Sequence, residues 1–354
     1  MKTVSVCVIA YNEEKFLPNL FNDILSQTYP KELMEVVLVD AMSSDRTREI
    51  MESFKDANNG FYSVKIVDNP KKTQASGWNK AIVTATGDVI IRIDAHSHIP
   101  EAYMAKCMNN IESGEYVTGG PRPCVIENET EWGKLLLETE NSLFGSSINK
   151  SRRTGEKSYV NTMFHAAYRR EVFANVGGFN ENLLRTEDNE FHYRVRKAGF
   201  KLLFDPEAET YQYARNSLKR MLKQKYGNGY WIGLTLGVSP KCLAIYHFVP
   251  FCFVLGIVFT TVLACVGIWQ LAMMMWGLYA LFAVTNTALS LKNNGFNKFF
   301  YIMPFLFLML HISYGWGTLR GVLNMPFMRK KLKNCDAIDE VRNAVKAGGT
   351  YEKV

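Results

Sequence analysis

The chain has 354 residues, of which 47% are hydrophobic and 21% are charged, and its net charge is +7. This length allows one large domain together with a further region. The seven cysteines include no CxxC pair, so neither a zinc site nor a disulfide framework is indicated. This suits a domain that faces the reducing cytoplasm.

Residues 1 to 205 alternate strand-like and helix-like segments, which predicts an α/β domain with a mostly parallel sheet. The expected strands span residues 3–10, 35–40, 62–68 and 88–94. The segments between them have helical spacing of apolar residues, over residues 14–27, 45–57 and 73–85. In such a sheet, ligands bind beyond the carboxyl ends of the strands, so the residues that follow each strand are the candidates for function.

Polar segments follow all four strands: "AYNEE" (10–14), "VDAMSSDRT" (39–47), "DNPKKTQASGWNKA" (68–81) and "DAHSH" (94–98). Neither GxGxxG nor GxxxxGK[ST] occurs, so a dinucleotide-binding enzyme and a P-loop NTPase are not indicated.

Together with "GGFNENLLRTEDNEFHYRVRKAG" (177–199), these segments resemble the family 2 inverting glycosyltransferases with the GT-A fold, over roughly residues 3 to 205. "RIDAH" (92–96), a later "YGNGYW" (226–231) and apolar C-terminal segments are most similar to a membrane-bound subgroup, typified by a succinoglycan glucosyltransferase. That subgroup builds bacterial exopolysaccharide on a lipid carrier. The resemblance implies a GT-A catalytic domain over residues 1–214.

The resemblance also implies a nucleotide-sugar donor. The residues that match its donor site are Ala10, Tyr11, Asn12, Glu13, Asp40, Lys72, Gln74, Asn79, Asp94 and Ala95. It favours a UDP-sugar, although the carboxylate of Asp40 can accept hydrogen bonds from either uracil or guanine. Lys72 could pair with phosphate oxygens, or it could belong to a solvated loop.

A divalent cation, Mn²⁺ or Mg²⁺, would offset the charge of the leaving diphosphate. The family uses Asp-x-Asp as the metal motif, whereas this sequence has Asp94 and His96. Imidazole suits Mn²⁺ better than Mg²⁺, which prefers oxygen ligands. The alternative is that His96 and His98 only cap the loop.

A second acidic motif lies in "RTED", residues 185–188. Thr186 is a good N-cap for the helix that follows, and a carboxylate in the first turn is stabilised by the helix dipole. The resemblance implies that Asp188, with Glu187 beside it, is the general base that deprotonates the acceptor hydroxyl. The alternative is a pair of capping acids. The candidates for acceptor binding are His165, Gly178, Gln224 and Trp231.

The C-terminal part indicates a membrane protein. Residues 215–241 form a basic amphipathic segment suited to a bilayer interface, and residues 242–291 contain no Asp, Glu, Lys or Arg. The expected spans are residues 246–267 and 271–291, and the third apolar segment, 299–323, is either re-entrant or a full span. Basic residues in 292–298 and in the tail, 324–354, predict that both face the cytoplasm with the catalytic domain.

These features predict a multi-pass enzyme of the bacterial inner membrane. It would move a single hexose from a nucleotide-diphosphate sugar to a polyprenyl-diphosphate-linked saccharide, and no nucleic-acid partner is expected. Two alternatives stay open: a polyprenyl-monophosphate glycosyltransferase, and a non-catalytic membrane assembly subunit that keeps the fold.

Overall fold

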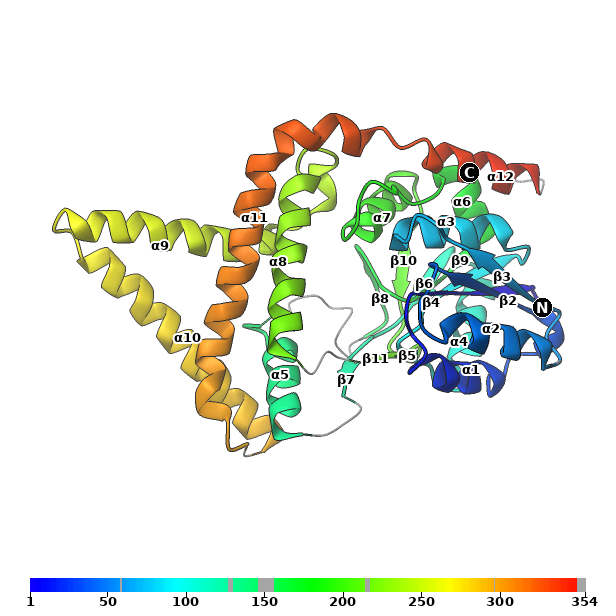
Figure 1. Ribbon diagram of the computed structural model, residues 1–354, viewed down its shortest axis with the longest axis horizontal. Helices are drawn as coiled ribbons and strands as arrows, with labels where there is room; N and C mark the ends of the chain where they lie inside the picture. Colours follow the sequence, from blue (N-terminus) through cyan, green and yellow to red (C-terminus); the bar gives the residue numbers. More distant parts are fainter. Residues whose placement is uncertain (58, 127–129, 146–155, 214–216, 296, 349–354) are drawn as a thin grey trace. The chain divides into compact units, whose positions relative to one another are not determined.

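A computed structural model describes residues 1–57, 59–126, 130–145, 156–213, 217–295 and 297–348 (Figure 1). The chain divides into two compact units. We call residues 1–123, 153–213 and 331–354 the sheet unit, and residues 124–152 and 214–330 the helical unit. The expected boundary at residues 214–215 and the last six residues of the expected tail lie outside the described residues.

Among the described residues, eight strands of the sheet unit form one sheet, in the order β3-β2-β1-β4-β9-β6-β10-β8. The strands are β1 (Val4–Ala10), β2 (Met34–Asp40), β3 (Ser63–Asp68), β4 (Val89–Asp94), β6 (Val117–Gly119), β8 (Ser158–Val160), β9 (Ala166–Arg169) and β10 (Leu202–Phe204). The four expected strands are all present and pair in parallel. The sheet is mixed, because β9 is antiparallel to β4 and β6, and β8 is antiparallel to β10.

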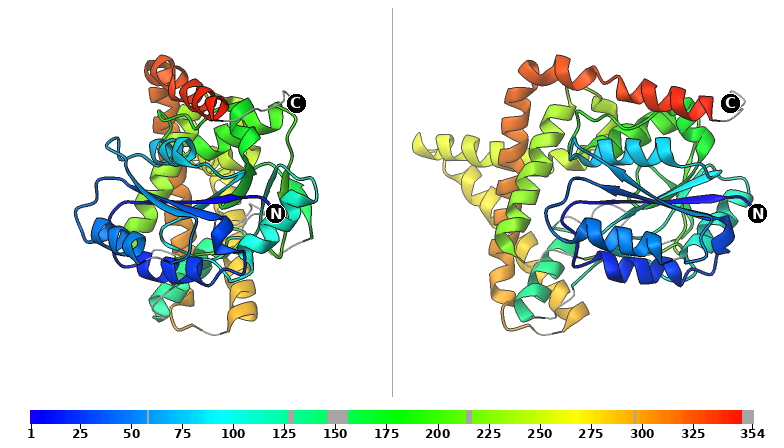
Figure 2. Two further views of the ribbon diagram at one scale, coloured as in Figure 1. Left: turned by 90° about the vertical axis from the view of Figure 1, so that its right-hand side faces the viewer. Right: turned by 45° about the vertical axis from the view of Figure 1, so that its right-hand side comes forward.

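Helices cover both faces of this sheet (Figure 2). One apolar core is shared with α1 (Leu17–Leu25), α2 (Thr47–Asp56) and α4 (Tyr103–Glu112). The core on the other face is shared with α3 (Gln74–Thr84), α6 (Arg170–Val176), α7 (Glu187–Lys197) and α12 (Ala337–Ala347). The short elements of this unit are η1 (Lys31–Leu33), β5 (Ser97–His98) and β11 (Tyr211–Tyr213), and β5 pairs with β11 in antiparallel.

The strand register brings the polar strand ends together. Strands β1 and β2 are buried on both faces and consist largely of Val, Leu and Ile, as expected for inner strands of a parallel sheet. In the ladder, Ala10 is opposite Asp40, and Ile9 is opposite Asp94. The two aspartates therefore lie at the same edge of the sheet, on either side of β1.

The helical unit contains α5 (Glu131–Asn141), α8 (Leu218–Thr235), α9 (Val249–Cys265), α10 (Gln270–Asn294) and α11 (Met303–Lys333), of which the last three residues belong to the sheet unit. Its short elements are β7 (Cys124–Val125), η3 (Pro240–Cys242), η4 (Ile245–Phe248) and η5 (Phe300–Ile302). Helices α8 and α11 lie side by side (Figure 1), and glycines allow their backbones to approach closely. A Cβ on Gly229 would lie 2.0 Å from the carbonyl oxygen of Tyr314. Lys225 of α8 also pairs with Glu140 of α5, at 2.9 Å.

Three segments are long and apolar enough to cross a membrane, among the described residues. Helices α9 and α10 form a hairpin (Figure 1) that exposes large apolar side chains, such as Phe259 and Leu281 at 61% and 62%. Helix α11 is continuous from Met303 to Lys333, so the chain does not turn back within residues 303–323.

Candidate active site

The ends of the first three strands have an unusual backbone. Among the described residues, the non-glycine residues with positive φ are Asn12, Met42 and Lys72, at 56°, 58° and 55°. Each of them follows one of the first three strands. Residues other than glycine rarely adopt this backbone conformation, and those that do gather at functional sites. The backbone therefore marks the same sheet edge that the sequence motifs predict.

Two of the predicted donor residues, Asn12 and Asp40, accept hydrogen bonds from the loop after β2. Asn12 Oδ1 accepts the N–H of Ser44 at 2.8 Å, so the loops after β1 and β2 are joined. The buried carboxylate of Asp40 accepts the N–H of Ser43 at 3.1 Å. Ala10 and Ala95 are buried and bring no side-chain polar group to the site.

The loop after β3 contributes two further groups to the edge. The ammonium of Lys72 lies over the ring of Tyr11, 5.7 Å from its centroid, and both side chains are exposed. Gln74 is exposed at the first position of α3. Asn79, by contrast, is buried and uses its amide to bind Phe179, whose N–H it accepts at 2.7 Å and whose carbonyl oxygen it contacts at 2.9 Å. The structure therefore joins Asn79 to the segment before α7 and not to the strand-end group.

Asp94 ends β4 and lies beside two buried basic residues. Its Oδ2 accepts a hydrogen bond from Arg122 at 3.0 Å and lies 3.4 Å from Nε2 of His165. Burial would raise the pKa of Asp94, but the contacts with His165 and Arg122 lower it well below the usual range. Burial lowers the pKa of His165 to about 4, so this ring is neutral and Arg122 is the cation that balances Asp94. Within the described residues, no hydrogen bond reaches Oδ1 of Asp94, which is available to a ligand.

His96 does not fit the role of metal ligand that the sequence predicts. Its Nδ1 lies 3.1 Å from Oε1 of Glu13, and its Nε2 lies 2.8 Å from the amide nitrogen of Gln212. Burial would lower the pKa of His96, but Glu13 and Asp94 raise it. A metal ligand needs a neutral ring with a free lone pair, and both nitrogens are engaged here. No group of three or more His, Cys, Asp or Glu side chains is arranged to hold a metal in the described ranges.

The acidic pair lies at the start of α7. Thr186 occupies the predicted N-cap position, but its side chain makes no capping hydrogen bond. Burial raises the pKa of Glu187 to about 8, and the charge of Asp188 adds to this effect. Burial also raises the pKa of Asp188, whose Oδ1 accepts the N–H of Asn189 at 2.8 Å. Since Oε2 of Glu187 has no hydrogen-bond partner among the described residues, we assign the shared proton to Glu187 and the negative charge to Asp188.

Arg92 connects the two acidic motifs. It precedes Asp94 by two residues on β4, is only 4% exposed, and lies over the rings of Trp78 and Phe179, 4.6 and 4.8 Å from their centroids. Its charge lowers the pKa of Asp188 against the larger effect of burial. The charge of Asp94 contributes to the raised pKa of Glu187. The end of β4 and the start of α7 thus lie within electrostatic reach of each other.

The predicted acceptor residues are divided between the two units. His165 is buried, and its ring nitrogens contact Asp94, Ser97 and Thr210, so it supports the end of β4. Gly178 lies in the segment before α7. Gln224 and Trp231 are partly buried on α8, in the helical unit.

Sequence reasoning missed Arg122, Gln212 and Arg92. Arg122 lies in "GGPRP" (119–123) directly after β6, so a cation beyond a strand end was a readable signal. Gln212 carries no such signal, because its contact with His96 depends on the pairing of β11 with β5. Arg92 lies inside "VIIRID", where a single charged residue in a buried strand was the clue.

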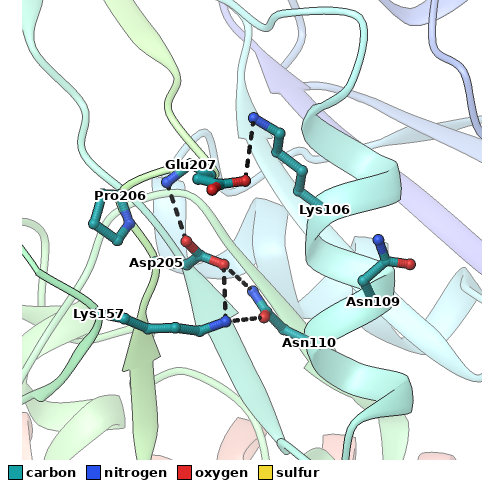
Figure 3. A pocket seen from close by; sticks show the side chains of 7 residues that line it. All are labelled: Lys106, Asn109, Asn110, Lys157, Asp205, Pro206 and Glu207. Carbon is teal, nitrogen blue, oxygen red and sulfur yellow. Dashed lines mark hydrogen bonds and ion pairs between the residues drawn. The ribbon is translucent and has the colours of Figure 1, made fainter.

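A pocket of about 440 Å³ lies elsewhere in the sheet unit (Figure 3). Its lining residues are Lys106, Asn109, Asn110, Lys157, Asp205, Pro206 and Glu207. Asp205 accepts a hydrogen bond from Asn110 at 2.7 Å and pairs with Lys157 at 3.3 Å. Asp205, Asn110 and Lys157 therefore satisfy one another, and the lining of the pocket includes none of the predicted site residues.

Comparison with known proteins supports the resemblance. Residues 5–177 match the family described as "Glycosyl transferase family 2". The chain is a glycosyltransferase. It is therefore an enzyme, and not a non-catalytic assembly subunit.

Two curated relatives of this glycosyltransferase are each 29% identical to it. One is the dolichyl N-acetyl-alpha-D-glucosaminyl phosphate 3-beta-D-2,3-diacetamido-2,3-dideoxy-beta-D-glucuronosyltransferase of Methanococcus voltae, aligned over 67% of this chain and 74% of the relative. The other is the succinoglycan biosynthesis protein ExoA of Rhizobium meliloti, aligned over 69% of this chain and 76% of the relative.

A solved structure supports the fold. The mannosyltransferase PcManGT from Pyrobaculum calidifontis, in complex with GDP-Man and Mn²⁺, is 18% identical and has a TM-score of 0.61. The match covers 90% of this chain and 87% of that one. The GT-A fold expected from the sequence is confirmed.

Proposed function

We propose that this enzyme transfers one hexose, with inversion, from a nucleotide-diphosphate sugar to a hydroxyl of a polyprenyl-diphosphate-linked saccharide. Asp188 acts as the general base that takes the proton of the attacking hydroxyl. The observation that carries the proposal is the convergence of the strand-end aspartate, Asp94, and the acidic pair at the start of α7 around the buried Arg92.

The charges of α7 suit this base. A carboxylate must be ionised to accept a proton, and burial opposes ionisation of both Glu187 and Asp188. The charge of Arg92 favours an ionised Asp188, whereas Glu187 keeps its proton at neutral pH because its pKa is about 8. One acid of the pair is thus kept as a base, and the other stays neutral beside it.

The donor is a nucleotide-diphosphate sugar, and a UDP-sugar is favoured by the family resemblance. The exposed Lys72, which lies over Tyr11, supports diphosphate binding. Both residues follow strands at the edge of the sheet where β2 ends in Asp40 and β4 ends in Asp94. A divalent cation, Mn²⁺ or Mg²⁺, would offset charge on the leaving diphosphate. The Mn²⁺ bound by PcManGT supports this, and Asp94 is the predicted ligand with an oxygen available.

The acceptor is proposed to be lipid-linked. Of the two relatives, one is named as a transferase that acts on a dolichyl phosphate sugar, and the other is a protein of succinoglycan biosynthesis. The apolar hairpin of α9 and α10 would hold the enzyme in the bilayer where such an acceptor resides.

We also propose two full membrane crossings, with the sheet unit on the cytoplasmic side of a bacterial inner membrane. Residues 331–354 belong to the same compact unit as residues 1–123, so the number of crossings between them must be even. Helices α9 and α10 are the better pair of spans, because they leave more of their apolar surface free for lipid. In an 18-residue apolar stretch, 11% is buried within the protein for each of these two helices, against 39% for the segment that contains α11.

The test is product analysis with purified enzyme in detergent. A panel of UDP-, GDP- and other nucleotide sugars is supplied with Mn²⁺ and one of two acceptors, a polyprenyl-diphosphate-linked saccharide or a polyprenyl monophosphate. We expect mass spectrometry to detect one added hexose on the saccharide. Transfer to the monophosphate alone would overturn the proposal in favour of the polyprenyl-monophosphate alternative.

A further inference from the structure

Residues 331–347, which we call the C-terminal brace, follow the last apolar segment and lie against the segment that leads into α7. We propose that the brace positions the catalytic helix α7, and hence Asp188, through Asn180 and Asn182. This inference rests on the proposed role of Asp188 as the base.

Direct hydrogen bonds join the brace to the segment before α7. Three residues of this segment donate to backbone carbonyls of the brace: Gly178 to Ile338 (3.1 Å), Asn180 to Leu332 (2.9 Å), and Asn182 to both Lys331 (2.9 Å) and Asn334 (2.8 Å). Lys331 and Leu332 belong to the last turn of α11, where carbonyl groups lack partners within the helix. The two asparagines therefore cap the C-terminus of α11.

Close packing reinforces these bonds. Val341 and Val345 of α12 are buried in the same apolar core as α3 and α6. A Cβ on Gly178 would lie 2.7 Å from Cγ2 of Val341, and one on Gly177 would lie 2.4 Å from the carbonyl oxygen of Ile338. The brace thus lies directly on the backbone of the Gly-Gly pair.

Helix α7 also binds this backbone. Arg194 of α7 donates to the carbonyls of Val176 at 2.8 Å and Gly178 at 2.7 Å. Arg342 of the brace donates to the same carbonyl of Val176, at 3.1 Å. The ring of Phe179 packs on Phe191 of α7, with centroids 4.3 Å apart. A displacement of the brace would therefore be passed on to α7.

The position of Asp188 depends on this support. Asp188 lies in the first turn of α7, and Thr186 does not cap that turn with its side chain. General-base catalysis needs the carboxylate within hydrogen-bond reach of the acceptor hydroxyl. An error of 1 Å caused by a remote substitution can cost about 100-fold in rate.

The test is the double variant Asn180→Ala/Asn182→Ala, with Asn59→Ala as the matched control. Asn59 also donates its amide to a backbone carbonyl, that of Phe54 at 2.8 Å, but it lies after α2 on the other face of the sheet. We expect the double variant to lose about 10- to 100-fold in turnover with unchanged UDP affinity and donor KM. The control should keep native turnover.

A positioning role is separated from a general structural one in the Asp188→Asn background. If the brace acts through Asp188, adding the two alanines should cause no further loss. A further loss of the same factor would overturn the proposal, as would native turnover in the double variant. Native turnover in Asp188→Asn alone would instead refute the proposed base. If the double variant fails to fold, Arg342→Gln removes one link of the brace, to Val176, and should show the same pattern.

Discussion

The two acids at the start of α7 differ in their surroundings at the scale of single atoms. Glu187 is 3% exposed with one oxygen that lacks a hydrogen-bond partner among the described residues, whereas Asp188 is partly buried and accepts a backbone N–H. Desolvation penalises an unbonded charge most, so the proton resides on Glu187. Neighbouring residues of the same chemical type thus have different protonation states.

Asp188→Asn and Glu187→Gln should therefore differ in their effect on turnover. We expect Asp188→Asn to lower turnover by about 10²- to 10⁴-fold while UDP affinity stays native, because only the proposed base is lost. Glu187→Gln mimics the protonated acid and should keep most of the native turnover at neutral pH. Product formation and UDP affinity are measured on the same preparations. Equal losses in both variants would contradict the assignment of the proton.

Substitutions of Asp94 and of His96 should also differ in their effects on metal-dependent nucleotide binding. Asp94→Asn removes the charge at the proposed diphosphate site, so we expect it to abolish Mn²⁺-dependent UDP binding. His96→Gln should leave the Mn²⁺ requirement unchanged, because both nitrogens of His96 already contact Glu13 and Gln212. Calorimetry with UDP and varied Mn²⁺ measures both effects. A raised Mn²⁺ requirement in His96→Gln would show that the ring turns to become a ligand.

At the scale of helices, α8 and α11 are held together by contact between their backbones. Gly229 and Gly233 on α8, and Gly317 and Gly321 on α11, allow this approach. The sequence predicts a basic interfacial segment over residues 215–241, and α8 does carry exposed lysines. Its glycine face, however, packs on α11, and the buried Lys225 pairs with Glu140. The helix therefore has a tertiary partner in addition to any lipid surface.

Gly321→Ala should weaken this pairing. The added Cβ would lie 2.1 Å from the carbonyl oxygen of Tyr230, and overpacking of this kind costs about 1–3 kcal/mol. Gly277→Ala in α10 is the control, because nothing lies within 4 Å of its Cβ, and alanine is favoured over glycine inside a helix. Thermal unfolding in detergent should show a lower midpoint for the first variant only. Equal midpoints would mean that α8 and α11 separate easily.

At the scale of the whole molecule, the chain returns to the sheet unit after its apolar segments, and this return limits the number of membrane crossings. The brace docks on α3 and α6 within the sheet unit, after the apolar segments have been passed. A chain that leaves and rejoins one folded unit must cross the bilayer an even number of times. Three segments are apolar enough to span, so composition alone would allow an odd number.

Reporters fused before Met1 and after Val354 should therefore give the same side of the membrane. The expected signal is cytoplasmic at both ends, because Lys292, Lys298 and the basic run at 329–333 favour that side. A reporter in the turn between α9 and α10, next to Gly267, should be periplasmic. Opposite signals at the two ends would rule out the docking of α12 on the sheet unit.

Local sequence patterns were sufficient to predict many of the strands, helices and apolar segments of this protein. The β-branched runs that became β1 to β4, the helices between them and the polar strand ends were predicted within a few residues. These features depend on side-chain period and on the rule that parallel strands end at one edge, both of which are written in consecutive residues. The apolar segments were equally readable, because a span needs only length and composition.

Only the tertiary structure decided which contacts form between residues that are distant in the sequence. Asn79 matched a donor motif, yet it binds Phe179, a hundred residues later along the chain. His96 matched a metal position, but Gln212 and Glu13 occupy its two nitrogens. Arg122 reached Asp94 from a separate strand end, and a segment that read as a basic tail folded into α12 on the sheet unit. Composition fixes which groups can interact, whereas only the packed chain selects the partner that each group receives.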